Sequence, residues 1–506
     1  MPPSQPLPYD TSRFSSPEEY VDSLLEFSRN PLLRLLCGGV HILDFFTKDR
    51  KDGASDDEPE DLYSAVLPEP WRAYLGKLEM DEVLELLLRT PVDQFSADVP
   101  DDLQWYIKEV RDHSLRREFA RVEESKRAMK ETRPGTERAL YAGMKPKKVH
   151  EVEHFAAFVD DLVHSIPDPP ISQILDYGSG QAYLSRTLAK KYSHNVLGLE
   201  SRPNNIQVSL ELDRRYDHLY AKSLLRSPSP TSTTPTGALT YLQTHITASS
   251  PLPPLDSENL LLISLHSCGN LLHHALHAFS TTPTVRAVAL IGCCHNLLTE
   301  RHGRTSKIPP SIHHPALTLR SPHPRVEALA AAADPSGFPI SQRFFAENIT
   351  LNITARSMAV QAPGNWTRDA SAGFFRRHYY RALLQRVVCD LGIVDMSMPA
   401  VTIGSLRKRD YESFESYTVA AAVKMGWRLD DAVEKLGGGA ASSTTSSKSY
   451  DILWSLMAFS ASIVESLIVV DRWVFLGEVE SVKERWVEVV FEYGESPRNL
   501  VVVGVR

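Results

Sequence analysis

The chain has 506 residues, of which 42% are hydrophobic, and this length predicts two to four structural units. Its formal net charge of −8 argues against a protein that coats nucleic acid by charge alone, although a local basic patch is compatible with it. The five cysteines do not indicate a secreted disulfide framework. The first residues also lack the basic and apolar regions of a signal peptide, so we expect a cytoplasmic or nuclear protein.

Residues 1–135 are predicted to form a helical accessory region. Ser16 stands before Pro17 and Glu18, which is the pattern of an N-cap followed by proline in the first helical turn. Apolar residues such as Val21 and Leu24 then recur at helical spacing.

From residue 136 to residue 310 the pattern changes to short apolar runs separated by helical segments. Apolar strands that alternate with helices predict an α/β fold, with a mostly parallel sheet covered by helices on both faces. The predicted strands are residues 171–177, 195–200, 239–246, 259–267 and 285–293.

Residues 311–485 are predicted to be a mostly helical insertion. Its most apolar stretch, 455–470, carries Glu465 and is too short to cross a bilayer comfortably. We therefore interpret it as a buried helix and expect no membrane association.

Two low-complexity stretches, residues 226–237 and 436–449, are predicted to be disordered because they are poor in residues that can form a core. The final segment, residues 486–506, contains two apolar runs around a turn at Ser496 and Pro497. It is predicted to be a β-hairpin that completes the sheet.

The first predicted strand ends in a glycine-rich turn, ILDYGSGQA. Asp176 ends the strand, and Gly178 and Gly180 follow, where glycine allows positive φ and close approach of a ligand to the backbone. Glu200 ends the second strand, and an acid at that edge can accept both hydroxyls of a ribose. Together these residues indicate a nucleoside-cofactor site.

The identity of the nucleoside follows from two departures from the dinucleotide pattern. Tyr183 stands where a dinucleotide-binding turn has its third glycine. The Asp176 carboxylate would repel a pyrophosphate but would suit a cationic, amino-acid-bearing cofactor. S-adenosylmethionine therefore fits this turn better than a nicotinamide dinucleotide.

Histidines and cysteines follow the fourth and fifth predicted strands. His266 and Cys268 end the fourth strand, and Cys293, Cys294 and His295 end the fifth, so they should meet at one edge of the sheet. Three interpretations stay open: a metal site, a catalytic role for His266 or His295, and packing by small cysteines beneath the cofactor. No metal ligand is assigned, because the spacing matches no standard zinc signature.

Two basic stretches are candidates for phosphate contacts. Lys148, in the lead-in to the first strand, is assigned to the cofactor carboxylate or a substrate phosphate, with a solvated linker as the alternative. Residues 376–381, RRHYYR, interleave bases with aromatics, which could stack on single-stranded RNA or lie half in a core.

Several motifs occur together in one order: GMKPKKVHEV, ILDYGSGQAYLSR, LGLE, LHSCGNL, GCCHNLLTE, SFESYTVAA, ESLIVVDR and SPRNLVVV. From about residue 100 to the end, the chain resembles the eukaryotic methyltransferase-like family that includes the "ribosomal RNA adenine dimethylase domain-containing" proteins. The resemblance implies a class I S-adenosylmethionine-dependent methyltransferase with a Rossmann-like sheet.

The His-x-Cys-Gly and Cys-Cys-His pair is also similar to the tRNA 2′-O-methyltransferase family. This resemblance implies that Gly178, Gly180 and Glu200 hold the cofactor. The residues that would line the reaction edge are His266, Cys268, Cys294 and His295. The chain departs from the family at Asn270, where Asp is usual, and LHSCGN replaces the Asn-Pro-Pro-Tyr type motif of adenine dimethylases.

The sequence thus predicts an S-adenosylmethionine-dependent methyltransferase that acts on a macromolecule, with RNA as the expected substrate. The alternatives are a protein methyltransferase and a non-catalytic methyltransferase-like adaptor. Protein partners are not predicted.

Overall fold

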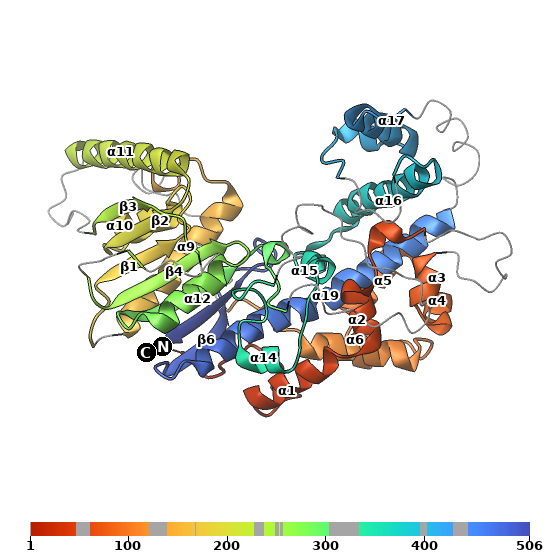
Figure 1. Cartoon of the computed structure of the whole chain (residues 1–506), viewed down its shortest axis with the longest axis horizontal. Helices are drawn as coiled ribbons and strands as arrows, with labels where there is room; N and C mark the ends of the chain where they lie inside the picture. Colours follow the sequence, from red (N-terminus) through yellow and green to blue (C-terminus); the bar gives the residue numbers. More distant parts are fainter. Residues whose placement is uncertain are drawn as a thin grey trace.

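The computed structural model describes an α/β unit joined to a helical body, which lie side by side in Figure 1. The described residues are 2–46, 61–120, 139–166, 168–226, 237–247, 252–253, 257–302, 333–394, 402–428 and 444–506.

The α/β unit is built on one sheet of seven strands. Their order across the sheet is β3-β2-β1-β4-β5-β7-β6, with β1 to β5 parallel and β7 antiparallel to both β5 and β6. This arrangement confirms the predicted five parallel strands and the predicted C-terminal hairpin. The strands are β1 (Gln173–Tyr177), β2 (Val196–Glu200), β3 (Leu239–Gln243), β4 (Leu260–Ser267), β5 (Val285–Gly292), β6 (Glu484–Val489) and β7 (Leu500–Val505).

Helices cover both faces of this sheet because alternate strand residues point to opposite sides. One face packs on α9 (Pro146–Ser165) and α10 (Tyr183–Lys191), and the other on α12 (Leu271–Thr281) and α19 (Thr444–Glu478). The strand residues toward α9 and α10 are Ile174, Val196, Leu261, Ala287 and Val501, and those toward α12 and α19 are Leu175, Leu262, Val288 and Val502. Helix α11 (Pro203–Arg226) connects β2 and β3.

The helical body surrounds α19, which contacts helices of the N-terminal region and of the insertion. The N-terminal region and the insertion, predicted as separate segments, therefore share one hydrophobic core. The N-terminal helices are α1 (Pro17–Phe27), α2 (Pro31–Arg34), α3 (Leu62–Val66), α4 (Glu69–Leu75), α5 (Met80–Leu88) and α6 (Asp101–His113). The later ones are α14 (Gln342–Ala346), α15 (Ile353–Met358), α16 (Arg368–Asp390) and α17 (Phe414–Met425).

Local sequence signals position these helices as expected. The Ser16 side chain accepts a hydrogen bond from the Glu19 backbone N–H, which confirms the predicted N-cap of α1. Helix α19 is, by length and composition alone, long enough to cross a membrane over Ser447–Glu478. Its most apolar window is 94% buried inside the protein, so the predicted buried helix is confirmed.

The structure describes only the ends of the two stretches that were predicted to be disordered. Residues 444–449 were expected to belong to a disordered loop, but α19 begins at Thr444, so this part of the prediction is wrong. The rest of that stretch, residues 436–443, lies outside the described residues, as do 227–236 and the start of the insertion, 311–332.

The RRHYYR stretch lies on α16, and its aromatic side chains are engaged inside the protein. The Tyr379 ring packs edge-on against Tyr450 with centroids 5.5 Å apart, and the His378 ring lies 5.0 Å from that of Trp454. The structure therefore favours the half-core interpretation over base stacking at this place.

Candidate active site

The glycine-rich turn lies at the carboxyl end of β1 and has the backbone that the sequence predicts. Gly178 and Gly180 have φ of +71° and +59°. A Cβ at Gly178 would lie 2.9 Å from Leu271 Cδ2, whereas a Cβ at Gly180 would meet no atom within 4 Å. Because Leu271 Cδ2 is the end of a flexible side chain, the positive φ rather than this contact favours glycine at 178, while Gly180 also faces open space that a ligand can enter.

Glu200, at the end of β2, faces this turn. Its Oε2 accepts the Gly180 N–H at 2.9 Å, and its Oε1 accepts the Arg202 N–H at 2.7 Å. The side chain is largely buried. The structure thus brings Glu200 to the glycine turn, as the ribose interpretation requires.

Asp176 lies buried at the base of the same turn. Its carboxylate accepts a hydrogen bond from the Ser185 hydroxyl at 2.5 Å. Burial raises the pKa of Asp176 to about 6, and the nearby Glu200 carboxylate adds to the rise, although Ser185 and the Lys148 ammonium oppose it. A cation brought to this turn would stabilise the charged form of Asp176.

Lys148, in the first turn of α9, interacts electrostatically with Asp176 at the glycine turn and with Cys293 after β5. Burial lowers the pKa of Lys148, and the carboxylates of Glu151 and Asp176 and the Cys293 thiol oppose that change. The structure thus places Lys148 close to the turn, and its assignment to the cofactor carboxylate stays a prediction.

The turn suits S-adenosylmethionine in charge and in free hydrogen-bonding groups. Asp176 and Glu200 are both carboxylates, which favour a sulfonium or ammonium over a phosphate. Each Glu200 oxygen accepts one backbone N–H and keeps a second lone pair for a ribose hydroxyl, and the backbone at Gly180 is open. The residues present therefore fit the cofactor.

His266 lies beside the turn, near the end of β4, and is held by an acid that the sequence analysis missed. Its Nε2 lies 3.1 Å from Glu151 Oε2, and 40% of the side chain is exposed. Glu151 is buried, and its Oε1 accepts the Ser496 hydroxyl at 2.9 Å. Burial would raise the pKa of Glu151, but His266, Ser496 and Lys148 together hold it below its usual value.

The sequence signal for this pair was present but was interpreted locally. Glu151 belongs to the KPKKVHEV motif, and Ser496 to a turn before β7, more than 340 positions later. Only the fold shows that Glu151 contacts both Ser496 and His266.

His295 is positioned differently from the catalytic role predicted for it. The side chain is 2% exposed, and its Nε2 lies 3.6 Å from Glu465 Oε1 on α19. Burial lowers the pKa of His295 to about 4. This enclosure favours a structural role for His295, and the catalytic role predicted for it stays a prediction.

Glu465 forms the centre of a buried ion network under the edge. It pairs with Arg117 at 2.7 Å and with Arg498 at 2.5 Å, and all three side chains are at most 17% exposed. This network joins the N-terminal region, α19 and the loop between β6 and β7.

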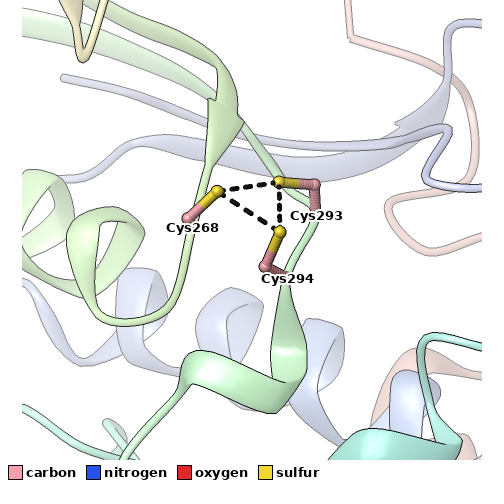
Figure 2. Close-up of side chains that lie close together, drawn as sticks. All are labelled: Cys268, Cys293 and Cys294. Carbon is pink, nitrogen blue, oxygen red and sulfur yellow. Dashed lines mark hydrogen bonds between the residues drawn. The ribbon is translucent and has the colours of Figure 1, made fainter. Parts of the chain in front are cut away.

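The structure gathers three cysteine thiols at the ends of β4 and β5. Figure 2 shows Cys268, Cys293 and Cys294 with their sulfurs pointing toward one another. The S···S distances are 3.4 Å for Cys268 to Cys293, 3.3 Å for Cys268 to Cys294 and 3.4 Å for Cys293 to Cys294. We call this group the thiol cluster.

Comparisons with known proteins agree with this site. A family model described as "Methyltransferase domain" matches residues 147–301. The chain is 25% identical over 275 residues to mouse "Probable methyltransferase-like protein 25", and 24% identical over 277 residues to the human protein of that name. These alignments cover 52% of this chain, and 41% and 40% of the two relatives, so the chain spans about two fifths of the length of the curated relatives it matches.

A solved structure of coclaurine N-methyltransferase, bound to N-methylheliamine and SAH, is 11% identical to this chain. That alignment covers 86% of this chain and 97% of the enzyme, with a TM-score of 0.21, which is too low to support an argument. The fold assignment rests on the sheet order and on the family match. Residues 147–301 are similar to a methyltransferase domain and have the predicted Rossmann-like α/β fold, and this similarity supports S-adenosylmethionine as the cofactor.

Proposed function

We propose that this protein transfers a methyl group from S-adenosylmethionine to RNA. The observation that carries the proposal is the contact of Glu200 with Gly180, because it places a ribose-binding acid against an open glycine turn. The cofactor supplies an electrophilic methyl group on a sulfonium, which an acceptor atom displaces in line.

Different residues at the carboxyl ends of the strands would bind the cofactor and orient the acceptor. Each carboxylate oxygen of Glu200 accepts one backbone N–H and keeps a second lone pair for a ribose hydroxyl. Asp176 would attract the cationic end of the cofactor. His266, oriented by Glu151, is placed to orient the acceptor or to take its proton.

Two features support a macromolecular acceptor that carries phosphates. His266 and Cys268 are exposed at the edge, so the acceptor side is open to a large substrate. Exposed cations flank the same edge: Lys145 and Lys147 stand at the start of α9, and Arg202 follows Glu200. Exposed lysines and arginines beside a reaction edge position nucleic acid through its phosphates.

The test is methyl transfer from radiolabelled S-adenosylmethionine to total RNA and total protein from cells that lack the gene. We expect the label to be removed by ribonuclease and to resist protease. The reverse pattern would replace RNA with a protein acceptor. If calorimetry gave no heat with S-adenosylmethionine, the non-catalytic adaptor would replace the enzyme.

The phosphate part of the proposal has its own variant. Replacing both Lys145 and Lys147 by Glu should weaken RNA binding and lower the dependence on salt, by about 0.7 in the log–log slope per lost phosphate contact. The affinity for S-adenosylmethionine should stay unchanged. Lys77→Glu, an exposed lysine in the turn before α5, is the matched control. Equal RNA affinity in the double variant and the control would contradict this role.

A further inference from the structure

The thiol cluster is poorly explained by packing. Buried free cysteine behaves as a small hydrophobic residue, and such residues are usually enclosed. Here Cys268 is exposed, and Cys293 and Cys294 are only partly buried. Three thiols that point at one another on an accessible edge indicate a common ligand.

The backbone holds the cluster in place. Gly269 has φ of +57°, and a Cβ there would lie 2.6 Å from the Leu297 carbonyl oxygen, so the turn after Cys268 packs directly on the segment after Cys294. The Gly269 N–H donates to the Cys294 carbonyl at 3.3 Å, and the Cys293 N–H donates to the Ser267 carbonyl at 3.4 Å. The two cysteine-bearing segments are thus tied to each other, and the sulfurs need little rearrangement to bind a ligand.

The spacing of the sulfurs suits a metal ion. In a triangle with sides near 3.4 Å, each sulfur lies about 2.0 Å from the centre. An ion about 1.2 Å above that plane would lie ~2.3 Å from every sulfur, which is the usual Zn–S distance. The described residues add no fourth histidine, cysteine or carboxylate to this group. Three protein ligands with one open position are the arrangement of zinc sites that bind water or a substrate.

Nearby charges suit a metal–thiolate centre. Three thiolates and one Zn²⁺ carry a formal charge of −1. The Lys148 ammonium and the buried Arg472 guanidinium both interact electrostatically with Cys293. Arg472 lies directly beneath the strand end, because a Cβ at Gly292 would be 2.5 Å from its Nη1. These cations can balance the centre.

We propose that Cys268, Cys293 and Cys294 bind one Zn²⁺ through their thiolates, with the fourth coordination position open at the acceptor side of the edge. Soft thiolate ligands select zinc over magnesium or calcium. The spacing of these cysteines in the sequence matched no zinc signature, because two of the ligands are adjacent and the third lies on the neighbouring strand. Metal binding at this place does not depend on which acceptor the enzyme methylates.

The test uses the full chain, reduced and freed of metal by a chelator. Zn²⁺ is added in competition with a chromophoric chelator, and bound metal is measured by mass spectrometry. We expect one Zn²⁺ per chain. Co²⁺ in its place should give a thiolate-to-metal absorption band and the intense visible bands of a tetrahedral site. Absence of bound Zn²⁺ in the reduced protein would overturn the proposal.

Variants locate the site and separate it from the proposed function. Loss of a residue that only contacts a metal ligand typically costs 10–100-fold in metal affinity. Cys268 and Cys294 are proposed as direct ligands, so Cys294→Ser and Cys268→Ser should each weaken Zn²⁺ binding by more than about 100-fold. Cys389→Ser, a partly buried cysteine on α16, is the matched control and should bind normally. Unchanged Zn²⁺ affinity in Cys294→Ser would place the metal elsewhere. Calorimetry with S-adenosylmethionine on the same variants should show unchanged affinity, so failure of the zinc site is distinguishable from failure of the cofactor site.

Discussion

Replacing Glu200 by Gln tests the cofactor site most directly, because it keeps the shape of the side chain and removes its charge. In the structure, Glu200 accepts the N–H groups of Gly180 and Arg202, one on each carboxylate oxygen. The Ser201 hydroxyl lies 3.4 Å from Oε1, at the outer limit of hydrogen bonding. A glutamine has one accepting oxygen and one donating nitrogen, so it cannot serve both backbone groups and both ribose hydroxyls.

The magnitude follows from the number of bonds lost. A hydrogen bond to a charged group contributes about 1.5–3 kcal/mol, and the Glu200→Gln variant loses at least one such bond to the ribose. Because 1.4 kcal/mol is a factor of ten in affinity, the Kd for S-adenosylmethionine should rise by about ten- to one-hundred-fold. The variant should also be less stable without cofactor, since one backbone N–H faces an amide nitrogen.

Isothermal titration calorimetry measures the affinity, and circular dichroism checks that the variant is folded. The matched control is Glu211→Gln, because Glu211 is an exposed acid on α11. A folded Glu200→Gln variant that binds S-adenosylmethionine as tightly as the control does would refute the ribose role.

Three further changes test the surroundings of the site. Gly180→Arg should abolish S-adenosylmethionine binding, because the new side chain enters the open space beside the turn, at a residue with positive φ. Circular dichroism should stay unchanged. A heat of binding equal to that of the wild type would contradict this prediction. Asp176→Asn should stabilise the cofactor-free protein by about 3 kcal/mol at pH 7.5. The pKa of Asp176 is raised from 3.8 to about 6 in the folded protein, so wild-type stability falls as pH rises from 3.8 to 6. Asparagine does not ionise and avoids this loss. Urea unfolding should show this gain vanishing near pH 4, and an equal gain at both pH values would argue against the ionised carboxylate as its cause. Glu465→Gln should destabilise the protein by about 3 kcal/mol in the same urea assay at pH 7.5, because it leaves the buried Arg117 and Arg498 without a full counter-charge. An unchanged urea midpoint would show that the ion network does not stabilise the fold.

Local patterns in the sequence were sufficient to predict the α/β unit. The strand runs, the glycine turn and the terminal hairpin are properties of neighbouring residues, so each could be recognised within about ten positions. Glu200 was found because the acid at the end of a second strand has a known place relative to the turn. These elements occur where they were expected.

What the sequence could not predict depends on contacts between distant segments. The pairing of Glu151 with His266 joins α9 to β4, and the burial of His295 results from Glu465 on α19. Histidine after a strand is equally compatible with an exposed catalytic group and with an enclosed structural one. Only the packing of the helical body against the strand ends distinguishes His266 from His295.

The proposed metal–thiolate centre would give this edge of the sheet a second anionic group beside the carboxylates of Asp176 and Glu200. Glu200 and Asp176 lie at the ends of β2 and β1, where they would face the cationic cofactor, and the thiol cluster lies at the ends of β4 and β5. Two such groups would repel each other without a cation between them. Lys148 can supply this cation, because its ammonium interacts electrostatically with both Asp176 and Cys293. The lysine was assigned from the sequence to the cofactor carboxylate or a substrate phosphate, and its interactions with Asp176 and Cys293 also suit a shared counter-charge.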